Sequence, residues 1–97
     1  MNLRFHRLLQ HDVNDAMEYY EQMGGLKLAG EFYDEVMLYA KAAVSTPERF
    51  HPIGARFRRA NLKHFPYHLL YEIRPEHIFV TVVKHNRRRP LFGTRRK

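Results

Sequence analysis

The residues best suited to chemistry lie near the carboxyl end of the chain, in a basic run. The run reads Lys84-His85-Asn86-Arg87-Arg88-Arg89-Pro90. Arginine pairs bidentately with phosphate or carboxylate, and a neighbouring histidine can transfer a proton in RNA cleavage. We therefore expect Lys84, Arg87, Arg88 and Arg89 to bind a target, and His85, Arg87 and Arg88 to be the candidate catalytic residues. If the chain stays extended, Arg87 and Arg89 point away from Arg88. The alternative is a solvated tail in which His85 only ends a strand.

A second basic group precedes this run, on a segment with strand-like alternation. It consists of Arg56, Arg58, Arg59 and Lys63, and we expect it to contact the same target or nucleic acid. Arg59 and Lys63 share a face because side chains alternate along a strand. If their strand lies two positions from the one that ends at Lys84, both groups border one shallow groove. The alternative is an edge strand whose charges prevent aggregation.

Other kinds of site are disfavoured by the residues that are missing or badly spaced. None of the seven histidines forms a pair with the compact spacing of a zinc motif, and there is no cysteine for a thiolate ligand or a disulfide. The chain also lacks a glycine-rich phosphate loop and a serine nucleophile motif. We expect no metal site and no cofactor.

Charge is divided unevenly between the two halves of the chain. Residues 1–55 carry five Lys/Arg and eight Asp/Glu, for a net charge of −3, whereas residues 56–97 carry twelve and two, for +10. Such segregation indicates a polyanionic partner, either nucleic acid or an acidic protein segment. The start of the sequence lacks the apolar core of a signal peptide, and no apolar run approaches the roughly 20 residues that span a bilayer. With no cysteine, the chain fits the cytoplasm.

Periodicity predicts an α+β fold with the order β-α-α-β-β-β. A strand is expected at residues 2–9, and Asp12 is expected to cap a helix over residues 12–23. Gly24-Gly25 then joins it to a second helix over residues 29–44, which forms an antiparallel hairpin with the first. Residues 47–55 read as a loop that Phe50 and Ile53 pin to the core. Strands at residues 56–63, 67–73 and 77–85 form an antiparallel meander.

The domain is expected to cover residues 1–92, and the basic tail 93–97 is expected to be mobile. Within it, the order and spacing of several short motifs resemble the RelE/ParE superfamily of type II toxins over nearly the whole chain. The motifs are Asp12, Ala16, Tyr19-Tyr20-Glu21, the helix Phe32–Val44, Pro47-Glu48-Arg49-Phe50, Arg58-Arg59-Ala60, Phe65-Pro66-Tyr67 and His85-Asn86-Arg87-Arg88 before Pro90.

This resemblance implies a bacterial or archaeal cytoplasmic toxin that is held inactive by a cognate antitoxin. RelE-type members cleave messenger RNA on the ribosome without a metal, whereas ParE-type members inhibit DNA gyrase. Phe92 stands where RelE-type nucleases have a tyrosine, and the pattern His-x-Arg-Arg-x-Pro after Phe-Pro-Tyr is closer to the ParE-like and plasmid-stabilisation subgroups. We therefore favour a ParE-like toxin. The alternatives are an mRNA endoribonuclease, and an inactive homologue or plain nucleic-acid-binding module.

The resemblance also implies how an antitoxin binds. Antitoxins of this family wrap the toxin with an acidic, disordered segment that folds on binding. The basic half of this chain has the right sign for such a partner. We expect its apolar helix to lie in a groove between the helical hairpin and the sheet, bordered by Tyr19, Met23, Phe32 and Tyr39. Ordinary surface is the alternative for these side chains.

Overall fold

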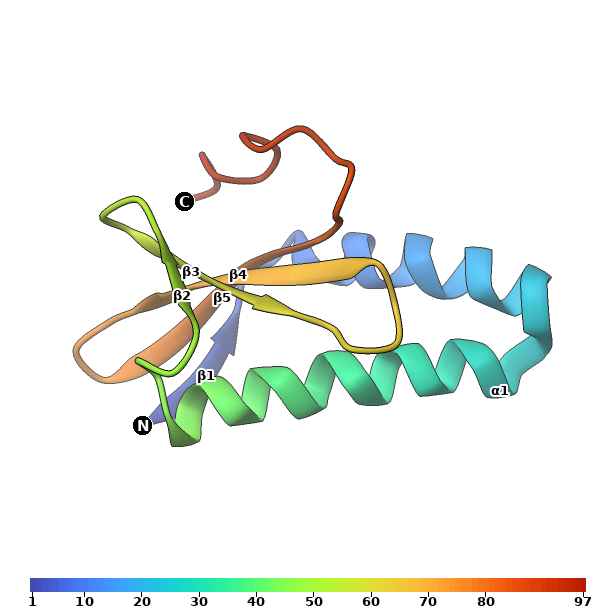
Figure 1. Ribbon diagram of the computed structural model, residues 1–97, viewed down its shortest axis with the longest axis horizontal. Coiled ribbons are helices and arrows are strands. Elements are labelled where there is room, and N and C mark those ends of the chain that lie inside the picture. The colour runs from blue at the N-terminus through green and yellow to red at the C-terminus, as the bar shows by residue number, and fades with distance from the viewer.

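The fold is a five-stranded sheet with a helical hairpin on one face (Figure 1). The computed structural model describes all residues 1–97. The elements are β1 (Asn2–Phe5), α1 (Leu9–Ser45), β2 (His51–Ile53), β3 (Phe57–Asn61), β4 (Tyr67–Ile73) and β5 (His77–His85). No helix here combines the length and the apolar character that crossing a bilayer needs.

α1 consists of two antiparallel arms that meet at a sharp bend, as the hairpin prediction required (Figure 1). At the bend, Gly24 has φ −149° and ψ 16°, and Gly25 has φ 81° and ψ −176°. The second conformation is one that glycine adopts at little cost and other residues avoid. The pair of glycines therefore both ends the first arm and turns the chain back.

The first arm starts earlier than expected, and its predicted cap is wrong. The helix begins at Leu9, Leu8 occupies the N-cap position, and no side chain caps the first turn. Asp12 lies inside the first turn instead, where its carboxylate accepts a hydrogen bond from the backbone N–H of Val83 and pairs with Arg96. A tertiary contact at the helix start thus replaces the local cap that the sequence indicated.

The strand order across the sheet is β1-β5-β4-β3-β2. β1 pairs with β5 in parallel, and the other neighbours are antiparallel, so the predicted meander of β3, β4 and β5 is confirmed. The prediction of a continuous loop at residues 47–55 is wrong, because His51–Ile53 pairs with β3 as the edge strand β2. Phe50 does pack against the core, whereas Ile53 is 39% exposed.

A β-bulge in β5 changes which side chains enter the core. Leu70 pairs with Val82 but its neighbour Tyr71 pairs with Val80, so Thr81 is the extra residue. Val83 consequently packs in the main core under the helices, while Val82 faces the other side of the sheet. Strict alternation along β5 would place Val82 on the same face as Val80, and it does not hold beyond the bulge.

The main core lies between the hairpin and the sheet. Small residues at the contact (Ala16, Ala40, Ala43 and Ala60) are buried, which lets the helices approach the strands closely. An aromatic cluster joins the second arm of the hairpin to the turn before β4: the ring of Phe32 lies 5.2 Å from that of Phe65 and 5.0 Å from that of Tyr67. Aromatic pairs with this edge-to-face geometry add to the stability that burial alone provides.

After β5, residues 86–97 fold back over the second face of the sheet, and we call them the C-terminal segment (red in Figure 1). Phe92 packs there against a small apolar cluster of Phe57, Leu70 and Val82. The last residues are held by polar contacts: the imidazole Nε2 of His6 lies 3.0 Å from the carbonyl oxygen of Lys97. Whether residues 93–97 are mobile stays a prediction.

Candidate functional site

The two basic groups meet on the sheet face that lies opposite the helices. Arg59 of β3, His68 of β4 and Lys84 of β5 project from this face, because Arg59 is paired with Leu70 and His68 with Lys84 in the strand register. They line a shallow groove with a volume of about 100 Å³, together with Ile53, Leu70, Asn86, Arg88 and Pro90. We call it the open-face groove.

Lys84 is a structural residue of this groove, since its side chain is 4% exposed. Its ammonium group donates to three carbonyl oxygens of the C-terminal segment, those of Arg89 (3.2 Å), Pro90 (2.7 Å) and Phe92 (3.0 Å). Burial lowers the pKa of Lys84, and the nearby positive charge of Arg59 adds to this effect. All three protons of the ammonium group are used, so Lys84 shapes the groove and has no donor left for a target.

The arginines after β5 lie in a turn, which corrects the expected continuation of the strand. The backbone N–H of Arg88 donates to the carbonyl of His85, so the extended alternation through Arg87, Arg88 and Arg89 ends there. Arg87, Arg88 and Arg89 are all exposed. The guanidinium carbon of Arg88 lies 3.9 Å from the ring centroid of Phe92, a cation–π contact that directs it along the groove wall.

The remaining arginines of the second basic group mainly hold loops in place by donating hydrogen bonds to their backbone carbonyls. Arg58 lies on the helix side of β3 and donates to the carbonyls of Glu48 (3.0 Å) and Phe50 (2.8 Å). Arg56 forms an ion pair of 3.1 Å with Glu72, and it also donates to carbonyls of the C-terminal segment. Lys63 is exposed just beyond β3. Of this group, only Arg59 lines the open-face groove.

His85 points to the helix side of the sheet, away from the open-face groove. Its ring forms an edge-to-face pair with Tyr67 at 5.1 Å, and its Nδ1 accepts a hydrogen bond of 3.0 Å from the backbone N–H of Arg87. Asp15 and Arg88 line the same small cleft, which has a volume of about 140 Å³. Burial raises the pKa of the Tyr67 hydroxyl, which therefore stays protonated and can donate a hydrogen bond at neutral pH.

The open-face groove contains a histidine that was not selected from the sequence. His68 is 3% exposed, and its Nδ1 lies 2.8 Å from the side-chain oxygen of Asn86. The same oxygen accepts from Arg59 at 3.5 Å. Alternation along residues 67–73 places His68 on the face opposite Leu69 and Tyr71, and its pairing with Lys84 in the strand register identifies it as a residue of the groove.

The four residues expected to border an antitoxin groove do not form one surface. Tyr19 and Met23 are 53% and 66% exposed, as a contact surface requires. Phe32 is fully buried in the aromatic cluster, so it cannot line an open groove. Tyr39 is partly buried and packs near Phe50.

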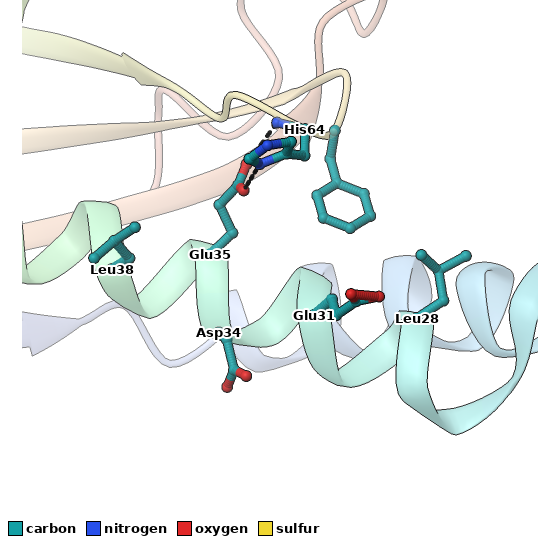
Figure 2. Close-up of a pocket in the computed structure, with 7 residues that line it drawn as sticks. Leu28, Glu31, Asp34, Glu35, Leu38 and His64 are labelled. Atoms are coloured by element: carbon teal, nitrogen blue, oxygen red, sulfur yellow. Dashed lines mark hydrogen bonds and ion pairs between the residues drawn. The ribbon is translucent and has the colours of Figure 1, made fainter.

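The open groove of the helical layer lies instead between the second arm of α1 and the turn before β4 (Figure 2). Its volume is about 600 Å³, and its walls combine apolar and acidic side chains, including Leu28, Leu38, Glu31 and Asp34. At its edge, Glu35 accepts hydrogen bonds from the backbone N–H of His64 (2.9 Å) and pairs with its Nδ1 (2.6 Å). Burial alone would raise the pKa of Glu35, but these bonds outweigh it and the pKa is lowered.

The chain thus consists of an N-terminal strand, a helical hairpin and an antiparallel meander with an arginine-rich end. A chain of the solved chromosomal ParDE TA system from P. aeruginosa has this fold, with a TM-score of 0.78 and 16% sequence identity. The match covers 88% of this chain and 95% of that chain. No family model and no curated protein matches the sequence. The ParE-like fold is therefore shown by structure, while sequence identity is too low to transfer an activity.

Proposed function

We propose that this protein is the toxin of a type II toxin–antitoxin module and that it inhibits growth through the open face of its sheet. The observation that carries the proposal is the exposed run Arg87–Arg89 on a ParE-like fold, in which Arg88 lines the open-face groove together with Arg59. Guanidinium groups that project from a shallow face suit a large anionic surface better than a small substrate.

We infer that the toxin is ParE-like, with DNA gyrase as the candidate target, and that it acts in the cytoplasm. The ParDE neighbour supports this branch. Phe92 also supports the ParE-like branch, since RelE-type nucleases have a tyrosine at this position and a phenyl ring has no titratable hydroxyl. The ring of Phe92 instead packs beneath Arg88. An mRNA endoribonuclease is the second candidate, and it rests on the arginines and histidines of the same end of the sheet.

A cognate antitoxin completes the proposal. The half of the chain beyond residue 55 carries a net charge of +10, so an acidic segment that folds over the open face would neutralise the arginines. Such coupled folding covers a large surface even when the groove beneath is shallow. Tyr19 and Met23, both exposed on the first arm of α1, are candidate apolar contacts for the same partner.

The test is inducible expression in a bacterial host, with growth as the readout. We expect arrest by the unchanged protein and relief when the product of the adjacent gene is co-expressed. Arg87→Ala with Arg88→Ala should restore growth, because both side chains are exposed and removing them leaves the fold intact. Lys41→Ala, an exposed change on α1, is the matched control and should still arrest growth.

Two assays on purified protein then separate the branches. Loss of gyrase supercoiling activity supports the ParE-like reading, whereas cleaved message on translating ribosomes overturns it in favour of the nuclease. If growth is unaffected and neither assay responds, the chain is an inactive homologue or a plain nucleic-acid-binding module.

A further inference from the structure

The groove between the second arm of α1 and the turn before β4 has no role in the proposed function. Its inner wall is one side of that arm, where Leu28, Glu31, Glu35 and Leu38 follow one another at helical spacing (Figure 2). Phe65 lines it from the turn. Leu38 is 63% exposed, so the groove, with a volume of about 600 Å³, presents apolar surface that nothing in the chain covers. We call it the acidic groove.

The charge of the acidic groove is negative and largely unpaired. Glu31 and Asp34 are exposed, and neither belongs to an ion pair within the protein. No lysine or arginine lines the groove, and its single histidine, His64, pairs with Glu35. The acidic antitoxin segment proposed for the open face would be repelled here. The groove instead matches a partner that combines cations with an apolar side chain.

Such a segment exists in the chain itself, directly after β5. Residues Arg87–Phe92, which we call the arginine loop, carry three exposed arginines and also Leu91, which is 70% exposed. The backbone N–H of Phe92 donates to the carbonyl of Arg89 over 2.9 Å, so Leu91 lies at the tip of a tight turn. The arginine loop therefore presents an apolar side chain beside its guanidinium groups.

The backbone of the arginine loop is fixed before any partner binds. The buried ammonium group of Lys84 binds three of its carbonyls, at distances between 2.7 and 3.2 Å. Binding a preformed loop costs less conformational entropy than ordering a mobile tail. Leu91 is therefore held in a fixed, exposed position, as a docking residue requires.

The arginine loop cannot reach the acidic groove of its own copy. The groove lies in the helical layer, whereas the loop leads into the C-terminal segment on the other face of the sheet (Figure 1). A contact between loop and groove must therefore join two copies. Each copy then uses its loop toward one neighbour and its groove toward another, which is a heterologous arrangement.

We propose that the acidic groove binds the arginine loop of a second copy of this protein. Leu91 of one copy enters the groove between Leu28 and Leu38 of the next. The exposed arginines of the loop pair with Glu31 and Asp34 at the rim. This contact goes beyond the proposed function and bears on it, because a copy whose arginine loop lies in a groove cannot present those arginines to a target.

Sedimentation velocity of the purified full chain tests the contact. The average mass should rise with protein concentration, and added salt should reduce it, because exposed ion pairs are screened. A protein that stays monomeric up to about 1 mM, where even weak contacts are populated, overturns the proposal. The groove would then be left to a basic segment of another protein.

Two charge-reversed proteins identify the surfaces. Glu31→Lys with Asp34→Lys makes the groove positive, and Arg87→Glu with Arg89→Glu makes the loop negative. Each alone should associate about tenfold more weakly than the unchanged protein, because attractive pairs become repulsive. A mixture of the two should associate again, since the loop of each variant then matches the groove of the other. Each pair of reversals changes the net charge of +7 by four, to +11 or +3, so both proteins stay positive and general attraction does not explain the recovery.

Glu18→Lys with Glu21→Lys is the matched control. Both positions are exposed on the first arm of α1, and the change in net charge equals that of the groove variant, so this protein should associate like the unchanged one. Leu91→Ser should weaken association without any change in charge. Unaltered association of the groove variant contradicts the proposal, as does a mixture that stays monomeric while circular dichroism shows both members to be folded.

The growth assay is independent of these results. Growth arrest by a protein that never associates contradicts only the contact between copies, and association without growth arrest contradicts only the toxin.

Discussion

The ammonium group of Lys84 makes three hydrogen bonds to backbone carbonyls of the C-terminal segment, and these bonds fix the position of the groove wall. A buried cation is costly unless its donors are all satisfied. Here each proton of the ammonium group has an acceptor. The charge that made Lys84 a candidate for target binding therefore stabilises the C-terminal segment, which carries Arg88.

Lys84→Met should destabilise the protein by about 2–4 kcal/mol, because it leaves three carbonyls without their charged donor. Chemical denaturation monitored by circular dichroism measures the loss. Lys63→Met, at an exposed site just beyond β3, should change the free energy of unfolding by no more than about 0.5 kcal/mol. Equal effects of the two substitutions would show that the buried lysine does not hold the segment.

At the scale of elements, the hairpin of α1 depends on the conformation of one glycine. Gly25 has φ 81°, in the region that L side chains rarely adopt, and a Cβ added there would meet no neighbouring atom. Gly30 lies within the second arm and also has open space around its α-carbon, with an ordinary φ. Because neither position is crowded, the two glycines differ in backbone strain alone.

Gly25→Ala should lower the free energy of unfolding by about 1–3 kcal/mol, because alanine would have to adopt the strained backbone conformation of the bend. Gly30→Ala should instead stabilise the protein by about 0.5–1 kcal/mol, because alanine is the better helix former. Thermal denaturation of both variants provides the comparison. Stabilisation by Gly25→Ala would mean that the bend relaxes into a continuous helix.

The second arm is also held to the turn before β4 by the bonds of Glu35 to His64. The pKa of Glu35 is lowered below its ordinary value, so in the acid range the unfolded chain binds more protons at this residue than the folded protein does. Its stabilising effect is complete above the unfolded pKa and is lost as pH falls through the folded pKa.

Glu35→Gln should therefore flatten the decrease in stability below about pH 4.5 relative to the unchanged protein. Urea midpoints measured at several acid pH values give this slope. Glu31→Gln, an exposed acidic position on the same arm, should leave the slope unchanged. If stability decreases with the same slope in Glu35→Gln as in the unchanged protein, the bond from Glu35 to His64 does not contribute to the pH dependence of stability.

For the whole molecule, one ion pair joins the start of the first helix to the last residues of the chain. The guanidinium of Arg96 lies 2.7 Å and 2.9 Å from the two carboxylate oxygens of Asp12 and also donates to the carbonyl of Thr81. Asp12 accepts from the backbone N–H of Val83. Both contacts lie on the part of β5 that β1 does not cover, so the pair occupies an otherwise open sheet edge.

Arg96→Met should destabilise the protein by about 1–3 kcal/mol, because it leaves the nearly buried carboxylate of Asp12 without its cation. Arg95→Met is the matched control, since Arg95 is exposed and makes no such pair, and its effect should stay within about 0.5 kcal/mol. Hydrogen exchange of residues 93–97 in both proteins also tests the predicted mobility of the tail. Rapid exchange in the unchanged protein would show that the pair is transient.

Apart from the edge strand β2, the sequence by itself determined the elements and their order, because the signals are local. Apolar spacing set the two helical arms, the glycine pair set the bend, and short turns required neighbouring strands to run antiparallel. Charge segregation also indicated a basic end of the sheet. Phe32 and Val36 were recognisable as apolar stripe residues because helical periodicity decides burial over a few turns.

The tertiary structure alone decided which polar side chains are exposed and available to a partner and which stabilise the fold. Lys84 and Arg58 look like surface cations in sequence, but each donates to backbone carbonyls of a neighbouring loop, six and eight residues away, that folds back over it. The bulge at Thr81 reverses the faces of Val82 and Val83, and no local pattern marks it. Contacts such as these depend on how loops fold back and how strands pair, so a periodicity of two or 3.6 residues does not predict them.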